Sequence, residues 1–135
     1  MFGLFKKKKK PEKIEEKIEL SVEEKERLTK ENQQLMAQIA ELEQADSAEV
    51  SDLAGLYEKL GLNDAELNQV DSAIERLEKS LDYKLTIGDG YKKLMSLYNA
   101  KRAEAARNGN DAGIDKYMGK MDDMRQIAKK VTISR

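Results

Sequence analysis

The chain has 135 residues, of which 39% are hydrophobic and 38% are charged, and it contains no cysteine and no histidine. Disulfides, thiol nucleophiles, histidine general bases and the common zinc sites are therefore excluded. Such a length suits one domain with a tail or an arm, and the lack of cysteine is compatible with a reducing cytoplasm. Aromatic residues make up 5%, and the single proline is Pro11. Long amphipathic helices are favoured over a sheet, so we expect an all-α fold.

Charge is unevenly distributed along the chain, although the net charge is only −1. Five consecutive lysines occupy positions 6–10. Residues 12–50 hold 12 acids and 5 bases, whereas residues 51–135 hold 14 acids and 15 bases. The sequence therefore predicts a basic tip, an acidic arm and a near-neutral body. Because no basic stripe runs along the body, nucleic-acid binding is disfavoured as the function of that body.

Residues 1–11 form a short tail in which apolar side chains precede a lysine run. This order differs from that of a secretory signal, and no stretch reaches the roughly 18 apolar residues that a membrane span needs. Apolar side chains beside lysines are the two features that peripheral membrane attachment combines. We therefore predict contact with an anionic membrane surface through Phe2, Leu4, Phe5, Lys6, Lys7, Lys8, Lys9 and Lys10. A solubilising end, a nuclear-import tract and a phosphate-binding run are the alternatives.

Residues 12–46 are predicted to form a charged helical arm that resembles a coiled-coil strand. Ser21 followed by Glu24 is a capping-box pattern, so a helix is expected to begin near residue 21. A narrow apolar seam at heptad spacing follows, with an asparagine that would select register. The predicted association residues are Leu28, Asn32, Leu35, Ile39 and Leu42. The seam is expected to pair with a second copy or a partner helix, or else to pack on the body of its own chain.

Residues 47–131 are predicted to form the body of the protein from antiparallel helices. The first helix is expected to stop at Gly61, a natural left-handed cap, and the second to start at a capping box made by Asn63 and Glu66. From Leu67 to Leu85 the apolar residues alternate at spacings of three and four. This is the clearest helical face in the chain.

Two further helices are expected after a turn at residues 86–89. The third helix should begin near Asp89 and end at the turn-forming residues 108–110, after which Asp111 is expected to cap the last helix. Residues 132–135 are expected to fray. The predicted architecture is thus an all-α fold in which the arm precedes two repeat-like helical hairpins.

The two hairpins carry similar sequences about 40 residues apart. The stretch Leu53–Tyr57 corresponds to Leu94–Tyr98, and Ala73–Ile74 corresponds to Gly113–Ile114. On these matches residues 50–131 resemble a pair of tetratricopeptide-type repeats, although the family's tryptophan and closing proline are missing and the period exceeds 34 residues. The resemblance implies a scaffold that holds a partner peptide without catalysis. A plain antiparallel bundle is the alternative.

Other residue groups favour structural roles over chemistry. Tyr57 and Tyr98 are predicted to lie in the core. Met118, Met121 and Met124 fit either core packing or an adaptable binding surface. The acids around Gly109 lack the closing glutamate of a calcium loop, so an inter-helix turn is favoured there.

The sequence thus favours a non-enzymatic protein–protein interaction adaptor that uses no cofactor and no metal. We expect it in the cytoplasm, held peripherally at the inner face of the membrane. Its expected partners are a protein or a second copy, through the arm, and an anionic membrane surface, through the tail. The alternative is a nucleic-acid-associated protein that uses the lysine run.

Overall fold

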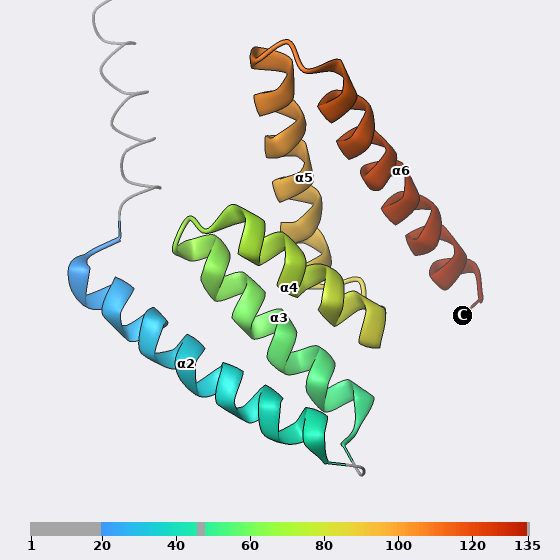
Figure 1. Cartoon of the computed structure of the whole chain (residues 1–135). Coiled ribbons are helices and arrows are strands. Elements are labelled where there is room, and N and C mark those ends of the chain that lie inside the picture. Colours follow the sequence, from blue (N-terminus) through green and yellow to red (C-terminus); the bar gives the residue numbers. More distant parts are fainter. Residues whose placement is uncertain (1–19, 46–47, 135) are drawn as a thin grey trace, which may run out of the picture.

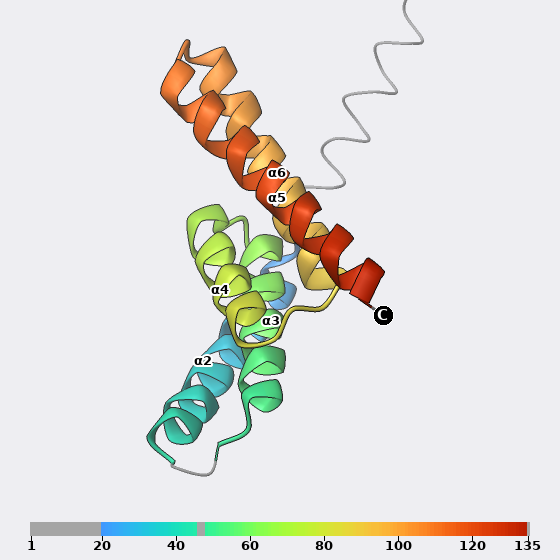
Figure 2. The same cartoon turned by 90° about the vertical axis from the view of Figure 1, so that its right-hand side faces the viewer.

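The computed structural model describes residues 20–45 and 48–134, and the regular elements in these ranges are all helices (Figure 1). They are α2 (Val22–Gln44), α3 (Val50–Glu66), α4 (Val70–Tyr83), α5 (Asp89–Arg107) and α6 (Asp111–Ser134). Helices α2, α3 and α4 lie side by side in chain order, while α5 and α6 form a hairpin that is joined to them through α5 (Figures 1 and 2). The predicted all-α class is confirmed for these residues, and neighbouring helices pack as hairpins.

Helix α2 begins where the sequence predicts. The backbone N–H of Glu24 donates to Ser21 Oγ at 3.1 Å, and the N–H of Ser21 donates to Glu24 Oε1 at 3.4 Å. Ser21 is the N-cap residue, and the two bonds together form a capping box. They satisfy N–H groups that a helix start otherwise leaves without a partner.

Helix α3 continues through Gly61, so the predicted stop at this residue and the predicted capping box at Asn63 and Glu66 are wrong. A Cβ atom on residue 61 would lie 2.7 Å from Leu77 Cγ in α4. Gly61 is therefore required by the close approach of two helices and not by a turn. Glycine is favoured both at helix ends and at close helix crossings. Its presence at position 61 therefore suggested a helix end where the structure has a crossing.

The turns that close the two hairpins are built alike. Helix α3 is followed by Asn68 in the left-handed conformation (φ 63°), and α5 is followed by Gly109 in the same conformation (φ 69°). In each turn the next residue's N–H donates to a carbonyl five positions earlier, at 2.8 Å. This is the hydrogen bond of a Schellman motif, which ends a helix and reverses the chain within a few residues.

The residue that caps the last helix is Asn110, one position before the Asp111 that the sequence suggests. The N–H of Gly113 donates to Asn110 Oδ1 at 3.1 Å, so Asn110 caps α6 and Asp111 is its first helical residue. The carboxylate of Asp111 still suits this end, because helix N-termini favour negative charge. The helix extends to Ser134, beyond the boundary at residue 131 that we expected.

The connection from α4 to α5 places α5 against α3. Helix α4 ends at Tyr83, so Leu85 lies in the connection, while α5 begins at Asp89 as predicted. The N–H of Gly90 donates to Glu58 Oε2 of α3 at 2.9 Å. A carboxylate at a helix N-terminus is favourable, so this bond helps to set where α5 starts.

Two hydrophobic clusters hold the helices together. The first joins α2 to α3, and its buried residues are Leu35, Ile39, Leu53 and Leu60. The second joins α4, α5 and α6, and its buried residues are Leu77, Leu94, Tyr98, Met121 and Met124. Burial of such side chains contributes about 1.5–3 kcal/mol each. The second cluster fixes α6 on α5.

Candidate functional site

The predicted association seam of the arm lies on the face of α2 that meets α3. Its members Leu28, Leu35 and Ile39 are each 5% exposed, and Asn32 is 6% exposed. Leu42 is half-buried at the edge of the first hydrophobic cluster. The seam is thus filled within one chain, which was one of the two arrangements that the sequence left open. Association of this seam with a second chain stays a prediction, and it would require α2 to leave α3.

Asn32 takes part in a buried polar network within its own chain. Its Nδ2 donates to Asp64 Oδ1 at 3.0 Å, and its Oδ1 accepts from Asn63 Nδ2 at 2.9 Å. These two hydrogen bonds form in one register only, so they specify how α2 lies along α3, although Asp64 Oδ2 has no hydrogen-bond partner among the described residues. Burial raises the pKa of the Asp64 carboxyl, although Arg76 and the Asn32 hydrogen bond act in the opposite direction.

The predicted membrane-contact residues lie outside the part of the chain that the structure describes. They are Phe2, Leu4, Phe5, Lys6, Lys7, Lys8, Lys9 and Lys10. Among the helices of the described ranges, none combines the length and the apolar character that a bilayer crossing needs. Contact of the tail with a membrane surface therefore stays a prediction.

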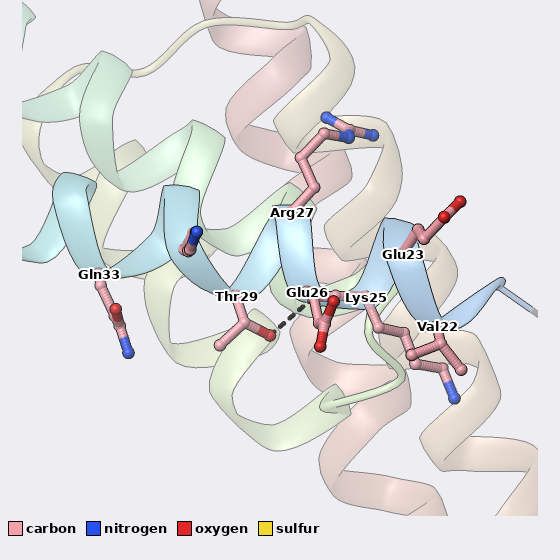
Figure 3. Close-up of a pocket in the computed structure, with 8 residues that line it drawn as sticks. Val22, Glu23, Lys25, Glu26, Arg27, Thr29 and Gln33 are labelled. Carbon is pink, nitrogen blue, oxygen red and sulfur yellow. Dashed lines mark hydrogen bonds between the residues drawn. The ribbon is translucent and has the colours of Figure 1, made fainter.

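A hollow of about 820 Å³ adjoins the first half of α2 (Figure 3). Its described lining comes from this one helix, whose labelled side chains leave the ribbon in several directions (Figure 3). The hydroxyl of Thr29 is already used, because it donates to the carbonyl of Lys25 at 2.8 Å. Side chains that diverge from one helix do not converge on a ligand, so this hollow lacks the arrangement of a ligand site.

A groove of about 440 Å³ between α4 and α6 has the features of a binding site. Its residues come from α4, from the connection to α5, from α5 itself and from residues 120–127 of α6. They are Glu78, Leu81, Asp82, Leu85, Leu94, Tyr98, Lys120, Asp123, Met124 and Ile127. The volume lies within the range of small-molecule sites, and an apolar lining with a few polar groups is typical of them.

The polar centre of this groove is Glu78, which α4 presents to both neighbouring helices. Tyr98 Oη of α5 donates a hydrogen bond to Glu78 Oε2, and Lys120 Nζ of α6 lies 3.2 Å from the same oxygen. The Lys120 ammonium also lies 5.5 Å from the centre of the Tyr98 ring. These contacts tie α4, α5 and α6 together at the middle of the groove, where the backbones of α4 and α6 are not in contact.

The environment of Tyr98 keeps its phenol protonated. Burial raises the pKa of Tyr98 well above its usual value, and the hydrogen bond to Glu78 and the charge of that carboxylate act in the same direction. Tyr57 shows the same behaviour on α3, where burial and Glu43 raise its pKa to about 12. A phenol held in this form is a poor general base near neutral pH. The arrangement around Glu78 therefore suits recognition better than proton transfer.

The rim of the groove offers unpaired negative charge beside exposed apolar surface. Asp82 and Asp123 are exposed, and neither forms an ion pair with any residue in the described ranges. Ile127 is 42% exposed and lies beside the half-buried Leu81 and Leu85, so the groove presents apolar surface to solvent. Exposed apolar surface with a charged rim is typical of interaction sites.

Sequence reasoning did not identify this groove, because its residues are spread over about 50 positions on four segments. The predictions for single residues fared better. Tyr98 is buried in the core, as predicted, and Met121 and Met124 are also buried, whereas Met118 is 51% exposed. The signal that the sequence did contain was the apolar stripe of α4, which continues to Leu85 beyond the end of the helix.

No group of three potential metal-ligating side chains lies close together within residues 20–45 and 48–134. Calcium and zinc sites need three or more such ligands. Accordingly, we assign no metal ligand to any described residue.

Comparisons with known proteins do not assign the chain to a family. No family model matches it, and no match was found among curated proteins or among solved structures. The resemblance to tetratricopeptide repeats thus gains no support from a family model.

Proposed function

We propose that this protein is a non-catalytic adaptor that binds a partner segment in the groove between α4 and α6. The observation that carries the proposal is the combination of apolar lining and unpaired acids in that groove. Leu81, Leu85 and Ile127 supply apolar surface, and Asp82 and Asp123 supply negative charge without a partner in the described ranges. Apolar contact supplies affinity in such a site, and the charges select the partner.

The chemistry of the rim specifies the kind of partner. Three of the four charged residues that line the groove are acids, and the one base, Lys120, is already paired with Glu78. A segment with apolar side chains flanked by lysine or arginine complements this surface. An acidic segment would meet like charges and is disfavoured.

The residues of the groove support binding rather than catalysis. Tyr98 and Lys120 both contact Glu78, and burial raises the pKa of Tyr98. The whole chain lacks histidine and cysteine, the commonest general base and the commonest thiol nucleophile. The proposed adaptor uses neither a cofactor nor a metal.

The tail is the proposed link to a membrane surface. A lysine near an anionic surface contributes about 1 kcal/mol, so the run at positions 6–10 provides about 5 kcal/mol. Insertion of Phe2, Leu4 and Phe5 adds the second signal that stable attachment needs. We place the adaptor in the cytoplasm, at the inner face of the membrane.

Peptide binding to the full-length protein tests the groove. The probes are a fluorescent helical peptide with leucines at spacings of three and four and lysines elsewhere, and a peptide with glutamates in place of the lysines. We expect only the basic peptide to bind, and the double variant Asp82→Lys/Asp123→Lys to weaken binding about tenfold or more. The control Glu41→Lys/Asp115→Lys makes the same charge change at exposed acids outside the groove. Equal loss in the two double variants would refute a groove site.

Vesicle co-sedimentation tests the tail separately. Binding is expected with vesicles that contain phosphatidylglycerol, to weaken with salt, and to fall when Phe2, Leu4 and Phe5 are changed to Ser with the lysines kept. Vesicle binding that survives deletion of residues 2–10 would refute this role. Salt-dependent DNA binding without any lipid binding would favour the nucleic-acid alternative instead.

A further inference from the structure

We propose that the groove between α4 and α6 binds residues 2–10 of its own chain, so that the tail is held either by the groove or by a membrane. The inference rests on the proposed function, because it names the occupant of the same groove. It is carried by a match of two independent properties, apolar surface and charge, between the groove and this one segment of the sequence.

The apolar side chains of the tail match the apolar lining of the groove. Phe2, Leu4 and Phe5 are three large apolar side chains within four positions, and such a group binds well only where it meets apolar surface. The groove offers apolar lining on both sides, from Leu85 next to α4 and from Ile127 in α6. The chain contains two phenylalanines, Phe2 and Phe5, and both lie in the proposed ligand.

The charge match separates this groove from the hollow beside α2. Lysines follow the apolar group of the tail directly, and the rim acids Asp82 and Asp123 have no ion-pair partner in the described ranges. The hollow beside α2 is lined by more bases than acids, namely Lys25, Arg27 and Lys30 against Glu23 and Glu26. A lysine-rich segment is therefore attracted by the acids of the α4–α6 groove, whereas the hollow beside α2 presents both attracting acids and repelling bases.

The chain between the tail and α2 is long enough for an intramolecular contact. Residues 11–19 span about 30 Å when extended, because each residue adds roughly 3.3 Å. Helix α4 has 14 residues and is therefore about 21 Å long. Asn32 of α2 contacts Asp64 near the end of α3, and the 11 residues from Ser21 to Asn32 cover about 17 Å. This distance and the length of α4 together make about 38 Å, whereas residues 6–19 span about 46 Å when extended, so Phe5 can reach the second half of α4.

The same residues cannot lie in the groove and in a lipid surface at once. An anionic membrane therefore competes with the groove for the tail, and it shifts the population only by the difference between the two affinities. A partner segment of similar chemistry competes with the tail for the groove. The consequence is coupling: partner binding frees the tail for the membrane, and membrane binding frees the groove for the partner.

Photo-crosslinking in the full-length protein tests the contact directly. Phe5 is replaced by p-benzoyl-phenylalanine, the protein is irradiated at low concentration without lipid, and the crosslinked peptides are identified by mass spectrometry. We expect crosslinks to residues of the groove, in particular Met124 and Ile127. Asp82→Lys/Asp123→Lys should remove them, while Glu41→Lys/Asp115→Lys should leave them unchanged. Crosslinks elsewhere in the folded chain, or crosslinks that persist in the groove variant, would overturn the proposal.

Isotope mixing shows which chain supplies the tail. Equal amounts of ¹⁵N-labelled and unlabelled protein are irradiated together, and crosslinks confined to light–light and heavy–heavy pairs support the intramolecular contact. Mixed light–heavy pairs in the statistical ratio would overturn it in favour of a second copy. Circular dichroism of each variant confirms that the helices are retained before the crosslinks are compared.

Vesicle binding then separates failure of this inference from failure of the adaptor proposal. Releasing the tail with Asp82→Lys/Asp123→Lys should strengthen binding to phosphatidylglycerol vesicles more than the control double variant does, by about tenfold for a tail that is docked nine-tenths of the time. Equal vesicle binding in the two double variants would overturn the competition. If the basic leucine peptide binds the groove but Phe5 crosslinks elsewhere, the tail is the wrong occupant and the adaptor proposal survives.

Discussion

Gly61 in α3 lies so close to Leu77 in α4 that a Cβ atom on residue 61 would be 2.7 Å from Leu77 Cγ. Leu77 is 0% exposed and belongs to the second hydrophobic cluster, so its side chain has little room to move. The same helix pair is joined by Ser80 Oγ, which donates to the carbonyl of Ala54 at 2.7 Å. Small residues at this crossing let the two helices approach closely, and α4 then presents Glu78 toward the groove.

A matched pair of glycine substitutions in α3 measures this close approach. Alanine favours a helix over glycine by about 1 kcal/mol. Gly55 has no atom within 4 Å of its would-be Cβ, so Gly55→Ala should raise the free energy of unfolding by about 0.5–1 kcal/mol. Gly61→Ala gains the same propensity but overpacks Leu77, and it should lower the free energy of unfolding by about 1–3 kcal/mol. Urea unfolding followed by circular dichroism checks both values, and similar effects at the two positions would contradict the packing argument.

The two Schellman turns permit a second comparison, between Asn68 and Gly109. Both residues have positive φ, and nothing lies within 4 Å of a Cβ placed on Gly109. Gly109→Ala should therefore cost about 1–2 kcal/mol through backbone conformation alone. Gly109→Asn should cost less, because asparagine tolerates this conformation, and Asn68→Gly should be close to neutral. If thermal unfolding shows alanine and asparagine to be equivalent at position 109, the left-handed turn is not what glycine provides there.

Asp64 predicts a defined pH dependence of stability. Its side chain is 5% exposed, its Oδ2 lies 3.9 Å from Arg76 Nε, and burial raises its pKa above the ordinary value of 3.8. The folded state then takes up the proton at a higher pH than the unfolded state. The cost of the ionised carboxylate is therefore fully present above the folded-state pKa and is relieved as the pH falls through that value.

Asp64→Asn isolates this effect, because the amide keeps an oxygen for Asn32 and cannot ionise. The free energy of unfolding of the wild type minus that of Asp64→Asn should become more positive as the pH falls from 7 toward 4. Other carboxyl groups contribute equally to both proteins and cancel in this difference. Urea titrations at several pH values provide the measurement. A difference that moves the opposite way would mean that Arg76 outweighs burial at this carboxyl.

Leu35 distinguishes packing within one chain from association between chains. It is 5% exposed and contributes to the cluster with Leu53 and Leu60, so Leu35→Ala should lower the free energy of unfolding by about 2–5 kcal/mol at any protein concentration. If the seam instead joins two chains, the melting temperature should rise with concentration and Leu35→Lys should convert a dimer to a monomer. Sedimentation and thermal unfolding at two concentrations decide between these outcomes.

A fragment of residues 48–135 retains the second cluster, and we expect it to unfold cooperatively but at a lower temperature.

The sequence by itself determined the class of the fold and several local features, because these depend on interactions within a few residues. The spacing of Ser21 and Glu24 predicted the start of α2, and Asp89 predicted the start of α5. The turn at residues 108–110 was likewise expected from its residues. Heptad spacing identified Leu28, Asn32, Leu35 and Ile39 as one buried face, although it could not say what would cover that face.

Only the tertiary structure decided the features that depend on distant residues. Gly61 suits a helix end and a helix crossing equally well, and only the presence of Leu77 beside it shows which applies. Asn63 suits a cap or a buried amide, and the position of Asn32 selects the second. The groove arises because Tyr98 and Lys120, which lie 20 and 42 positions after Glu78 on the next two helices, both meet its carboxylate. Local sequence patterns do not predict such contacts, because the free energy that stabilises the contacts comes from burial and pairing between helices.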